Sequence, residues 1–228
     1  MNFYVDEIYF YFIYFLLTFA KIFFTKEVFM LVTMKEILDR AKKDNYGVTS
    51  IMVDRSSLSY EDNIAQTKET VKMCRPLNIS VEAELGHVGQ SEDYSSDHFT
   101  KPEEVKKFVE ETGIDCLAVA IGTAHGRYHG TPHIDFDLLK QITDVVDIPL
   151  VLHGGSGTGD ENLRKAVKNG IQKVNLATEL VVAGKEELET FIQDKNFDKW
   201  QLIPSFIKGY SDRLEHYVNL FDQENRAW

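Results

Sequence analysis

The chain has 228 residues, 43% hydrophobic and 27% charged, which is typical of a globular domain with one sizeable core and excludes disordered and fibrous classes. Its net charge of −11 argues against a general binder of nucleic acid or of anionic membranes, so we expect a small-molecule partner. The two cysteines, Cys74 and Cys116, cannot form a disulfide framework, which favours buried free thiols and a cytoplasmic location.

The first 33 residues differ from the rest of the chain. Residues 8–24 read IYFYFIYFLLTFAKIFF, with a single charge. A membrane-spanning helix needs ~20 apolar residues, and the basic region and cleavage site of a signal peptide are missing. Two interpretations stay open: translation starts at Met30 or Met34 and the upstream residues are a start-site artefact, or residues 8–24 form a membrane or interfacial anchor. We assign 1–33 as an N-terminal extension and 34–228 as the folded domain.

From Met34 onward, short apolar runs alternate with longer segments of helical spacing, as in repeated strand–helix units. The predicted strands are 50–54, 80–85, 115–121, 149–152 and 173–176. The predicted helices are 34–43, 60–75, 136–145 and 161–169, together with one that lies between Thr100 and Gly113. The strand spacing of about 25 to 35 residues predicts an α/β fold of the (β/α)8 TIM-barrel type. Because a typical barrel has about 250 residues, we expect an incomplete one, with about five clear units and C-terminal helices.

Two helix boundaries have specific signals. Ser59 is placed to cap the helix that begins at Tyr60. Thr100 and Glu103 have the spacing of a capping box, in which the threonine hydroxyl and the glutamate satisfy free N–H groups of the first turn. Gly113 is expected to end that second helix.

Polar residues follow each predicted strand, where a parallel barrel carries its catalytic groups. His125 and His153 end neighbouring strands, which lie about 4.8 Å apart, so their imidazoles can share a metal ion. The alternative is a pair of hydrogen-bonded rim histidines. Asp54 and Glu84 lie on the same rim and are predicted to complete or neighbour the site, unless they serve as helix caps or ion-pair partners. The other histidines are interpreted as surface or loop residues: His87, His98, His129, His133 and His216.

A glycine-rich loop follows the next-to-last predicted strand. Small residues let backbone N–H groups approach an anion closely, and the helix that follows begins near Asp160. In barrels of this type, the loops after the last two strands usually form the phosphate site. The residues predicted to bind phosphate are Gly154, Gly155, Ser156, Asn175, Leu176, Ala177 and Thr178.

Four ordered motifs together resemble the class II, zinc-dependent fructose- and tagatose-bisphosphate aldolases. They are VEAELG at 81–86, AVAIGTAHGRYHGTP at 118–132, PLVLHGGSG at 149–157 and KVNLATEL at 173–180. The resemblance implies reversible cleavage of a ketose bisphosphate, fructose 1,6- or tagatose 1,6-bisphosphate, to dihydroxyacetone phosphate and glyceraldehyde 3-phosphate. It also implies zinc, with a monovalent cation as a further ligand, and a phosphorylated sugar as the binding partner.

The resemblance also implies roles for individual residues. In this family, the residues that match His125 and His153 bind zinc, and those that match Asp54 and Glu84 form an alternative or second metal position. The triose phosphate is held by the residues that match Gly126 and those of the two phosphate loops. Glu92, in the loop after ELG, matches the family's candidate for proton abstraction.

One block of the family pattern is missing. The chain passes from Val48 directly to Thr49, without the His-Leu-Asp-His-Gly type sequence that supplies a third zinc histidine and a proton-donating aspartate. We therefore infer an internal deletion near residues 48–50. Three alternatives stay open: an aldolase polypeptide that keeps the phosphate-binding half and part of the metal site, with weak zinc binding through His125 and His153; a non-catalytic module that pairs with a full-length aldolase subunit or is tethered to a membrane by residues 8–24; and an enzyme in which Asp54 or Glu84 replaces the missing ligand. Separately, the amphipathic tail at 203–221 offers a surface for a homo-oligomer.

Overall fold

The computed structural model describes residues 43, 52, 54–77, 80–89, 95–126, 128, 132–224 and 226, all within one compact unit, Thr33–Trp228. Several predictions lie outside these residues: the segment 8–24, most of the helix at 34–43 and of the strand at 50–54, the deletion near 48–50, and Glu92. Within the described part, no helix is both long enough and apolar enough to cross a membrane.

The centre of the fold is a parallel sheet of four strands in the order β1-β2-β3-β4. The strands are β1 Glu82–Leu85, β2 Cys116–Val119, β3 Leu150–Leu152 and β4 Ile171–Val174. This arrangement confirms the predicted α/β fold with a parallel sheet. The described strands form an open, barrel-like sheet and do not close into a complete barrel.

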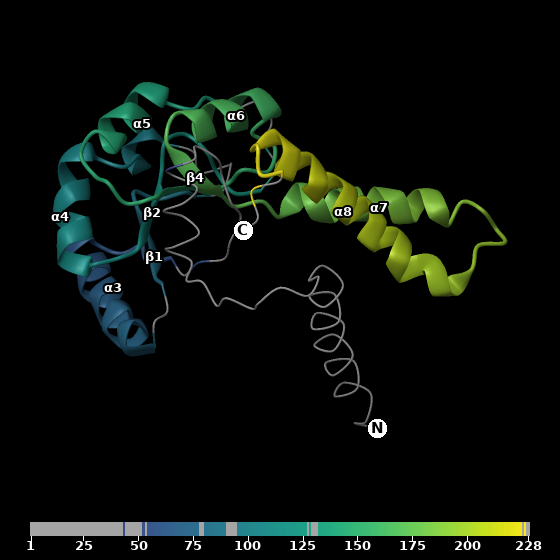
Figure 1. Cartoon of the computed structure of the whole chain (residues 1–228), viewed down its shortest axis with the longest axis horizontal. Coiled ribbons are helices and arrows are strands. Elements are labelled where there is room, and N and C mark those ends of the chain that lie inside the picture. The colour runs from purple at the N-terminus through teal and green to yellow at the C-terminus, as the bar shows by residue number, and fades with distance from the viewer. Residues whose placement is uncertain are drawn as a thin grey trace. The chain divides into compact units, whose positions relative to one another are not determined.

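Helices connect and cover the strands, because parallel neighbours can be joined only by long crossovers. They are α3 Tyr60–Cys74, α4 Pro102–Thr112, α5 Phe136–Thr143, α6 Asp160–Lys168, α7 Thr178–Phe191 and α8 Leu202–Leu220. Short 3-10 turns occur at η1 Arg75–Leu77, η3 Ser96–His98 and η4 Lys199–Gln201. Helices α4, α5 and α6 each link one strand to the next, and Figure 1 shows them around the outside of the sheet.

The outer face of the sheet forms the main hydrophobic core with these helices. Alternate strand residues point outward, as the two-residue period of a strand requires. Leu117 and Leu152 from the sheet are fully buried together with Phe108 of α4 and Leu139 of α5. Each fully buried side chain of this size stabilises the fold by about 1.5–3 kcal/mol, so this face supplies most of the stability.

The inner face of the sheet is different, because it carries ionisable groups around a small cluster of Cys116, Ala118 and Val151. Lys173 of β4 and Glu82 of β1 form an ion pair of 2.6 Å although two strands separate them. In a flat sheet these strands would be about 14 Å apart, given a spacing of about 4.8 Å. The sheet is therefore strongly curled, and the small side chains of β2 leave room for the longer ones to meet.

Two local predictions need correction. Thr100 does not cap α4, whose N-cap is Lys101 without a side-chain hydrogen bond. Instead the Thr100 hydroxyl donates to the Leu85 carbonyl and accepts from the Ala120 N–H at 2.8 Å, which ties β1 to β2. The last strand, predicted at 173–176, is Ile171–Val174, because Ile171 and Gln172 are buried and the Gln172 side chain accepts from the Leu150 N–H of β3 at 2.9 Å.

The other described boundaries agree closely with the predictions. The Ser59 side chain accepts from the Asp62 N–H at 3.2 Å and caps α3. Gly113 ends α4 with φ of 68°, a left-handed conformation that glycine adopts without strain. The remaining helices and strands lie within a few residues of their predicted limits.

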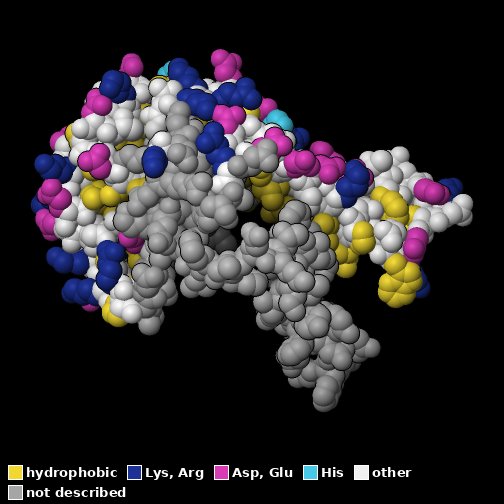
Figure 2. All heavy atoms as spheres, in the orientation of Figure 1, with side chains coloured by type: hydrophobic (Ala, Val, Ile, Leu, Met, Phe, Trp, Pro, Cys, Tyr) yellow, Lys and Arg dark blue, Asp and Glu magenta, His cyan; other side chains and the backbone are white. Residues whose placement is uncertain are grey.

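Helices α7 and α8 lie side by side as a hairpin (Figure 1). Three contacts fix the C-terminal part of α8: Tyr217 donates to the Glu179 carboxylate, His216 lies 3.0 Å from Asp160, and Lys168 pairs with Asp222. Figure 2 shows hydrophobic side chains along the hairpin. Its exposed large hydrophobic residues are Val181, Ile192, Trp200 and Ile203. Oligomerisation through this tail stays a prediction.

Candidate active site

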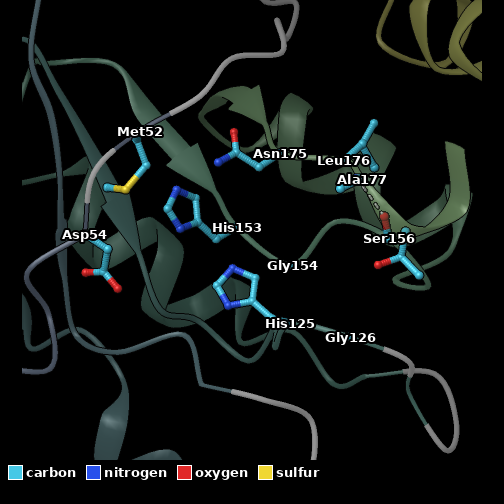
Figure 3. A pocket seen from close by; sticks show the side chains of 11 residues that line it. Met52, Asp54, His125, Gly126, His153, Gly154, Ser156, Asn175, Leu176 and Ala177 are labelled. Atoms are coloured by element: carbon cyan, nitrogen blue, oxygen red, sulfur yellow. Dashed lines mark hydrogen bonds between the residues drawn. The ribbon is translucent and has the colours of Figure 1, made fainter. Parts of the chain in front are cut away.

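A pocket of about 390 Å³ lies at the carboxyl ends of the strands. This is the edge at which parallel α/β proteins bind their ligands. Figure 3 shows the side chains that line it. The lining residues are Met52, Asp54, His125, Gly126, His153, Gly154, Ser156, Asn175, Leu176, Ala177 and Thr178.

The two predicted metal-binding histidines lie next to each other in the pocket (Figure 3). Their ring centroids are 5.9 Å apart. The backbone N–H of His125 donates to the Gly89 carbonyl at 2.8 Å, which ties the loop after β2 to the loop after β1. Gly154, after His153, has φ of 66°, and a Cβ there would lie 2.3 Å from the Ala124 carbonyl oxygen. A glycine is therefore required for the close packing of the two loops that carry the histidines.

His153 is held between two carboxylates of β1. Its Nε2 lies 3.0 Å from Glu82 Oε1, and its Nδ1 lies 2.6 Å from Glu84 Oε2. The second contact is a close ion pair without the alignment of a hydrogen bond, so Glu84 Oε2 is buried without a hydrogen-bond partner. Burial opposes the charged imidazolium, but the contacts with Glu82 and Glu84 outweigh it and raise the pKa of His153 to about 9.

Glu82 carries a second contact that stabilises its charge. Its Oε2 accepts from the Lys173 ammonium at 2.6 Å, and both side chains are almost completely buried. Burial opposes ionisation of this carboxyl, yet the contacts with His153 and Lys173 hold the pKa of Glu82 below its usual value. Three buried groups from β4, β1 and the end of β3 therefore form one continuous charged network beneath the pocket.

Glu84 also faces a second group, which the sequence analysis missed. Its Oε1 accepts from the Ser56 hydroxyl at 2.8 Å and from the Val88 N–H at 2.9 Å. The Ser56 hydroxyl lies 2.7 Å from His87 Nδ1, and the Ser56 N–H donates to Asp54 at 2.6 Å.

Donor atoms of Asp54, Glu84 and His87 lie within 4.8 Å of one another, close enough to hold one metal ion. In the described part of the chain, this is the one group of three or more potential ligands that meets this distance. His87 was interpreted as a surface or loop residue because no strand end or motif marked it. Its position two residues after Leu85, which ends β1, was the available signal.

The two predicted phosphate loops also meet. The Ser156 hydroxyl accepts from the N–H groups of Ala177 at 3.2 Å and Glu179 at 3.4 Å, at the start of α7. A Cβ at Gly155 would lie 2.9 Å from the Asn175 carbonyl oxygen, so a glycine is needed for this approach. Asn175 Oδ1 is buried without a hydrogen bond and belongs to a side chain that lines the pocket.

The structure therefore brings together most of the predicted site residues. Asp54, His125, His153, Gly126 and nearly all residues of the phosphate loops line one pocket. Glu84 is fully buried beside His153, and Gly155 does not line the pocket. The position of Glu92 is not described. The catalytic and binding roles of all these residues stay predictions.

The family of the chain follows from comparison with known proteins. Residues 32–226 match the family model of class II fructose-bisphosphate aldolases. The chain belongs to this family. The predicted resemblance is thereby confirmed at the level of the family.

Individual relatives support this membership. The uncharacterized protein YdjI of Escherichia coli K12 is 41% identical over 190 residues, 80% of this chain and 66% of YdjI. The crystal structure of that YdjI aldolase matches with a TM-score of 0.68 and 37% identity over 80% of this chain and 64% of the other. A putative fructose-1,6-bisphosphate aldolase of Coccidioides immitis matches with a TM-score of 0.66 and 31% identity over 84% and 69% of the two chains.

A fructose-bisphosphate aldolase of Campylobacter jejuni has a TM-score of 0.61 at 23% identity, covering 75% of this chain and 59% of the other, which shows the shared fold alone. The chain thus spans just under two thirds of the length of YdjI. The activity and ligands of these relatives are therefore only proposals for the present chain.

Proposed function

We propose that the chain binds a phosphorylated ketose together with a divalent metal ion and cleaves it by reversible aldol chemistry. The observation that carries this proposal is one pocket in which two histidines and a carboxylate face a glycine-rich loop and the start of a helix. Its volume of about 390 Å³ is within the range of small-molecule sites. The expected substrates are fructose 1,6- and tagatose 1,6-bisphosphate, with dihydroxyacetone phosphate and glyceraldehyde 3-phosphate as products.

The types of donor atom beside His125 and His153 suit zinc, although in the described part of the chain only Asp54, Glu84 and His87 form a group of three whose donor atoms lie within 4.8 Å of one another. Glu82 holds one nitrogen of His153, which leaves Nδ1 beside the buried, unbonded Glu84 Oε2 and the ring of His125. Two imidazoles and one carboxylate make a typical catalytic zinc set with an open position. Bound zinc supplies Lewis-acid polarisation of a substrate oxygen.

Asp54, Glu84 and His87 offer a second position for a metal ion, on the other oxygen of Glu84. His87→Gln and His125→Gln distinguish the two positions. If the histidine pair binds the ion, His125→Gln weakens zinc binding and His87→Gln has little effect; the reverse result assigns the ion to the second position. The measurement is competition for zinc with a chromophoric chelator.

The phosphate end of the substrate is assigned to the loop at 154–156 and the start of α7. The N-terminus of a helix carries partial positive charge and free N–H groups, which bind phosphate well. Ser156 satisfies two of these groups, the N–H groups of Ala177 and Glu179, in the present structure. A bound phosphate would share these donors with the serine hydroxyl, while Asn175 lines the same end of the pocket.

Proton transfer is the weak part of this site. The sequence has no counterpart of the family's proton-donating aspartate, and Glu92 is outside the described residues. A missing general acid or base typically costs about 10²–10⁴-fold in rate. We therefore expect slow turnover, together with weak zinc binding, because the sequence also lacks the family's third zinc histidine.

Cleavage of the two bisphosphates by the full chain tests this proposal, with triose phosphate release followed through a coupling enzyme. The expected result is slow cleavage that a chelator abolishes and zinc restores. Binding of zinc and inorganic phosphate without cleavage would establish the alternative, a non-catalytic binding module. Absence of both binding and cleavage from a folded sample would contradict the proposal as a whole.

A further inference from the structure

The buried pair of Lys173 and Glu82 has no direct part in the proposed reaction, because neither residue lines the pocket. Lys173 is 0% exposed and its ammonium donates to Glu82 Oε2 at 2.6 Å. The other oxygen of Glu82 lies 3.0 Å from His153 Nε2. The pair thus contacts a predicted metal ligand from the side away from the other carboxylate, Glu84.

Stability alone does not account for this pair. Removing two charges from water is costly, and well-packed hydrophobic residues in place of a buried ion pair are often as stable or more stable. The surrounding cluster of Cys116, Ala118 and Val151 is small and apolar, so hydrophobic side chains would suit the same space. The pair also fixes the direction of the carboxylate: Oε1 of Glu82 contacts His153, and Oε2 accepts from the Lys173 ammonium and, at 3.6 Å, from the Cys116 thiol.

We propose that Glu82 and Lys173 are positioning residues that fix the ring of His153, committing Nε2 to Glu82 and presenting Nδ1 to Glu84 and the pocket. A histidine that binds a metal through one nitrogen usually donates the other N–H to a carboxylate, which sets the ring orientation. Lys173 does not contact His153 itself; it fixes the carboxylate of Glu82 by donating to Oε2. This inference rests on the proposed metal-binding role of His153.

The positions of Glu82 on β1 and Lys173 on β4 follow from the geometry of the sheet. Glu82 and Glu84 are two residues apart on β1 and so point to the same inner face, one toward each nitrogen of His153. Lys173 reaches Glu82 only because the sheet is curled. The orientation of His153 is therefore coupled to the curvature that also shapes the pocket.

Zinc affinity of the full chain and its variants tests the inference, measured by competition with a chromophoric chelator. Glu82→Gln and Lys173→Met are expected to weaken zinc binding by about 10- to 100-fold, as loss of a partner of a metal ligand does. Lys173→Gln, which keeps a donor, is expected to show a smaller loss and replaces Lys173→Met if that variant does not fold.

Asp115→Asn is the matched control. Asp115 is also buried, accepts from the Val81 N–H at 2.7 Å and pairs with Arg75, but it lies at the opposite end of β2 from the pocket. Its substitution should destabilise the fold and leave zinc affinity unchanged. Glu82 and Lys173 variants that lose stability but keep the parent's zinc affinity would overturn the inference.

A second readout needs no metal. The ring N–H proton of His153, assigned by its loss in His153→Gln, should appear in the NMR spectrum as a resonance protected from exchange by Glu82. It should shift or vanish in Glu82→Gln and Lys173→Met and stay in Asp115→Asn. If the parent binds no zinc, the proposed function fails, and this resonance still decides the inference: an unchanged resonance in the variants contradicts it.

Discussion

The two faces of the sheet differ in composition: the outer face is hydrophobic, and the inner face carries charged side chains. On the outer face, Leu117 and Leu152 are buried against helices in one large hydrophobic cluster. The next residue after each of these leucines, Ala118 or His153, lies on the inner face, where His153 contacts two carboxylates and lines the pocket. The comparison shows that the two-residue alternation of the strands separates the hydrophobic core from the site, so a substitution on the outer face is expected to change stability with little effect on metal binding.

The largest expected effect is on the outer face. Phe108→Ala should lower the free energy of unfolding by about 3–5 kcal/mol, because this fully buried ring of α4 would leave a cavity. Met73→Ala, at an exposed residue of α3, is the control and should change stability by less than about 0.5 kcal/mol. Urea unfolding measures both. If the faces are independent, the folded fraction of Phe108→Ala keeps the zinc affinity of the parent.

A substitution on the inner face should affect both properties. Ala118→Leu adds bulk to β2 below Glu84 and His153, at a residue with no exposed surface. Overpacking typically costs about 1–3 kcal/mol, and we expect it to push the two site residues apart and weaken zinc binding. Ala65→Leu, on the exposed side of α3, is the matched control. Unchanged zinc affinity in Ala118→Leu would show that the inner face tolerates repacking and is less specialised than proposed.

The contact between α8 and α7 gives a smaller, pH-dependent effect. Burial and the hydrogen bond to Glu179 raise the pKa of Tyr217. The neutral phenol is favoured in the folded state, so this contribution is complete below the ordinary value of 10.0 and is lost as the pH rises above it. Tyr217→Phe should be less stable than the parent by about 0.5–1.5 kcal/mol at neutral pH. Urea unfolding should show this difference shrinking above pH 10; a constant difference would contradict the assignment.

The smallest effect concerns reactivity and leaves stability unchanged. Cys116 is on the inner face, and burial together with the nearby Glu82 raises the pKa of its thiol. Cys74, at the end of α3, is only partly buried. A thiol-specific reagent should therefore label Cys74 rapidly and Cys116 only on unfolding. Cys74→Ser is the control, and fast labelling of that variant would show that the inner face is open to solvent.

Local signals in the sequence predicted most of the fold. Ser59 and Gly113 mark the helix ends that they cap in the structure, because both effects act within one turn. Thr100 failed as a predicted cap because its hydroxyl donates to the Leu85 carbonyl and accepts from the Ala120 N–H, two groups far away in the sequence. The start of β4 was placed two residues late because Gln172 is polar, and its hydrogen bond to the Leu150 N–H of β3 depends on a strand far away in the sequence.

The sequence predicted the residues that line the pocket, but it did not predict the residues that support them. His125 and His153 were identifiable because each follows an apolar strand, and strand order places them side by side. Glu82 and Lys173 were missed since their contact depends on the curl of the sheet, which no local pattern reveals. His87 was missed because its relation to Asp54 is set by a loop.

The central claim is that the inner face holds a metal ion between the two rim histidines and Glu84. Titration of the metal-free full chain with zinc, in competition with a chromophoric chelator, tests it most directly when repeated on His153→Gln and on Asp115→Asn. We predict zinc binding of equal affinity by the parent and by Asp115→Asn, and its loss in His153→Gln. Equal zinc affinity of the parent and His153→Gln, or no binding by a folded parent, would contradict the claim.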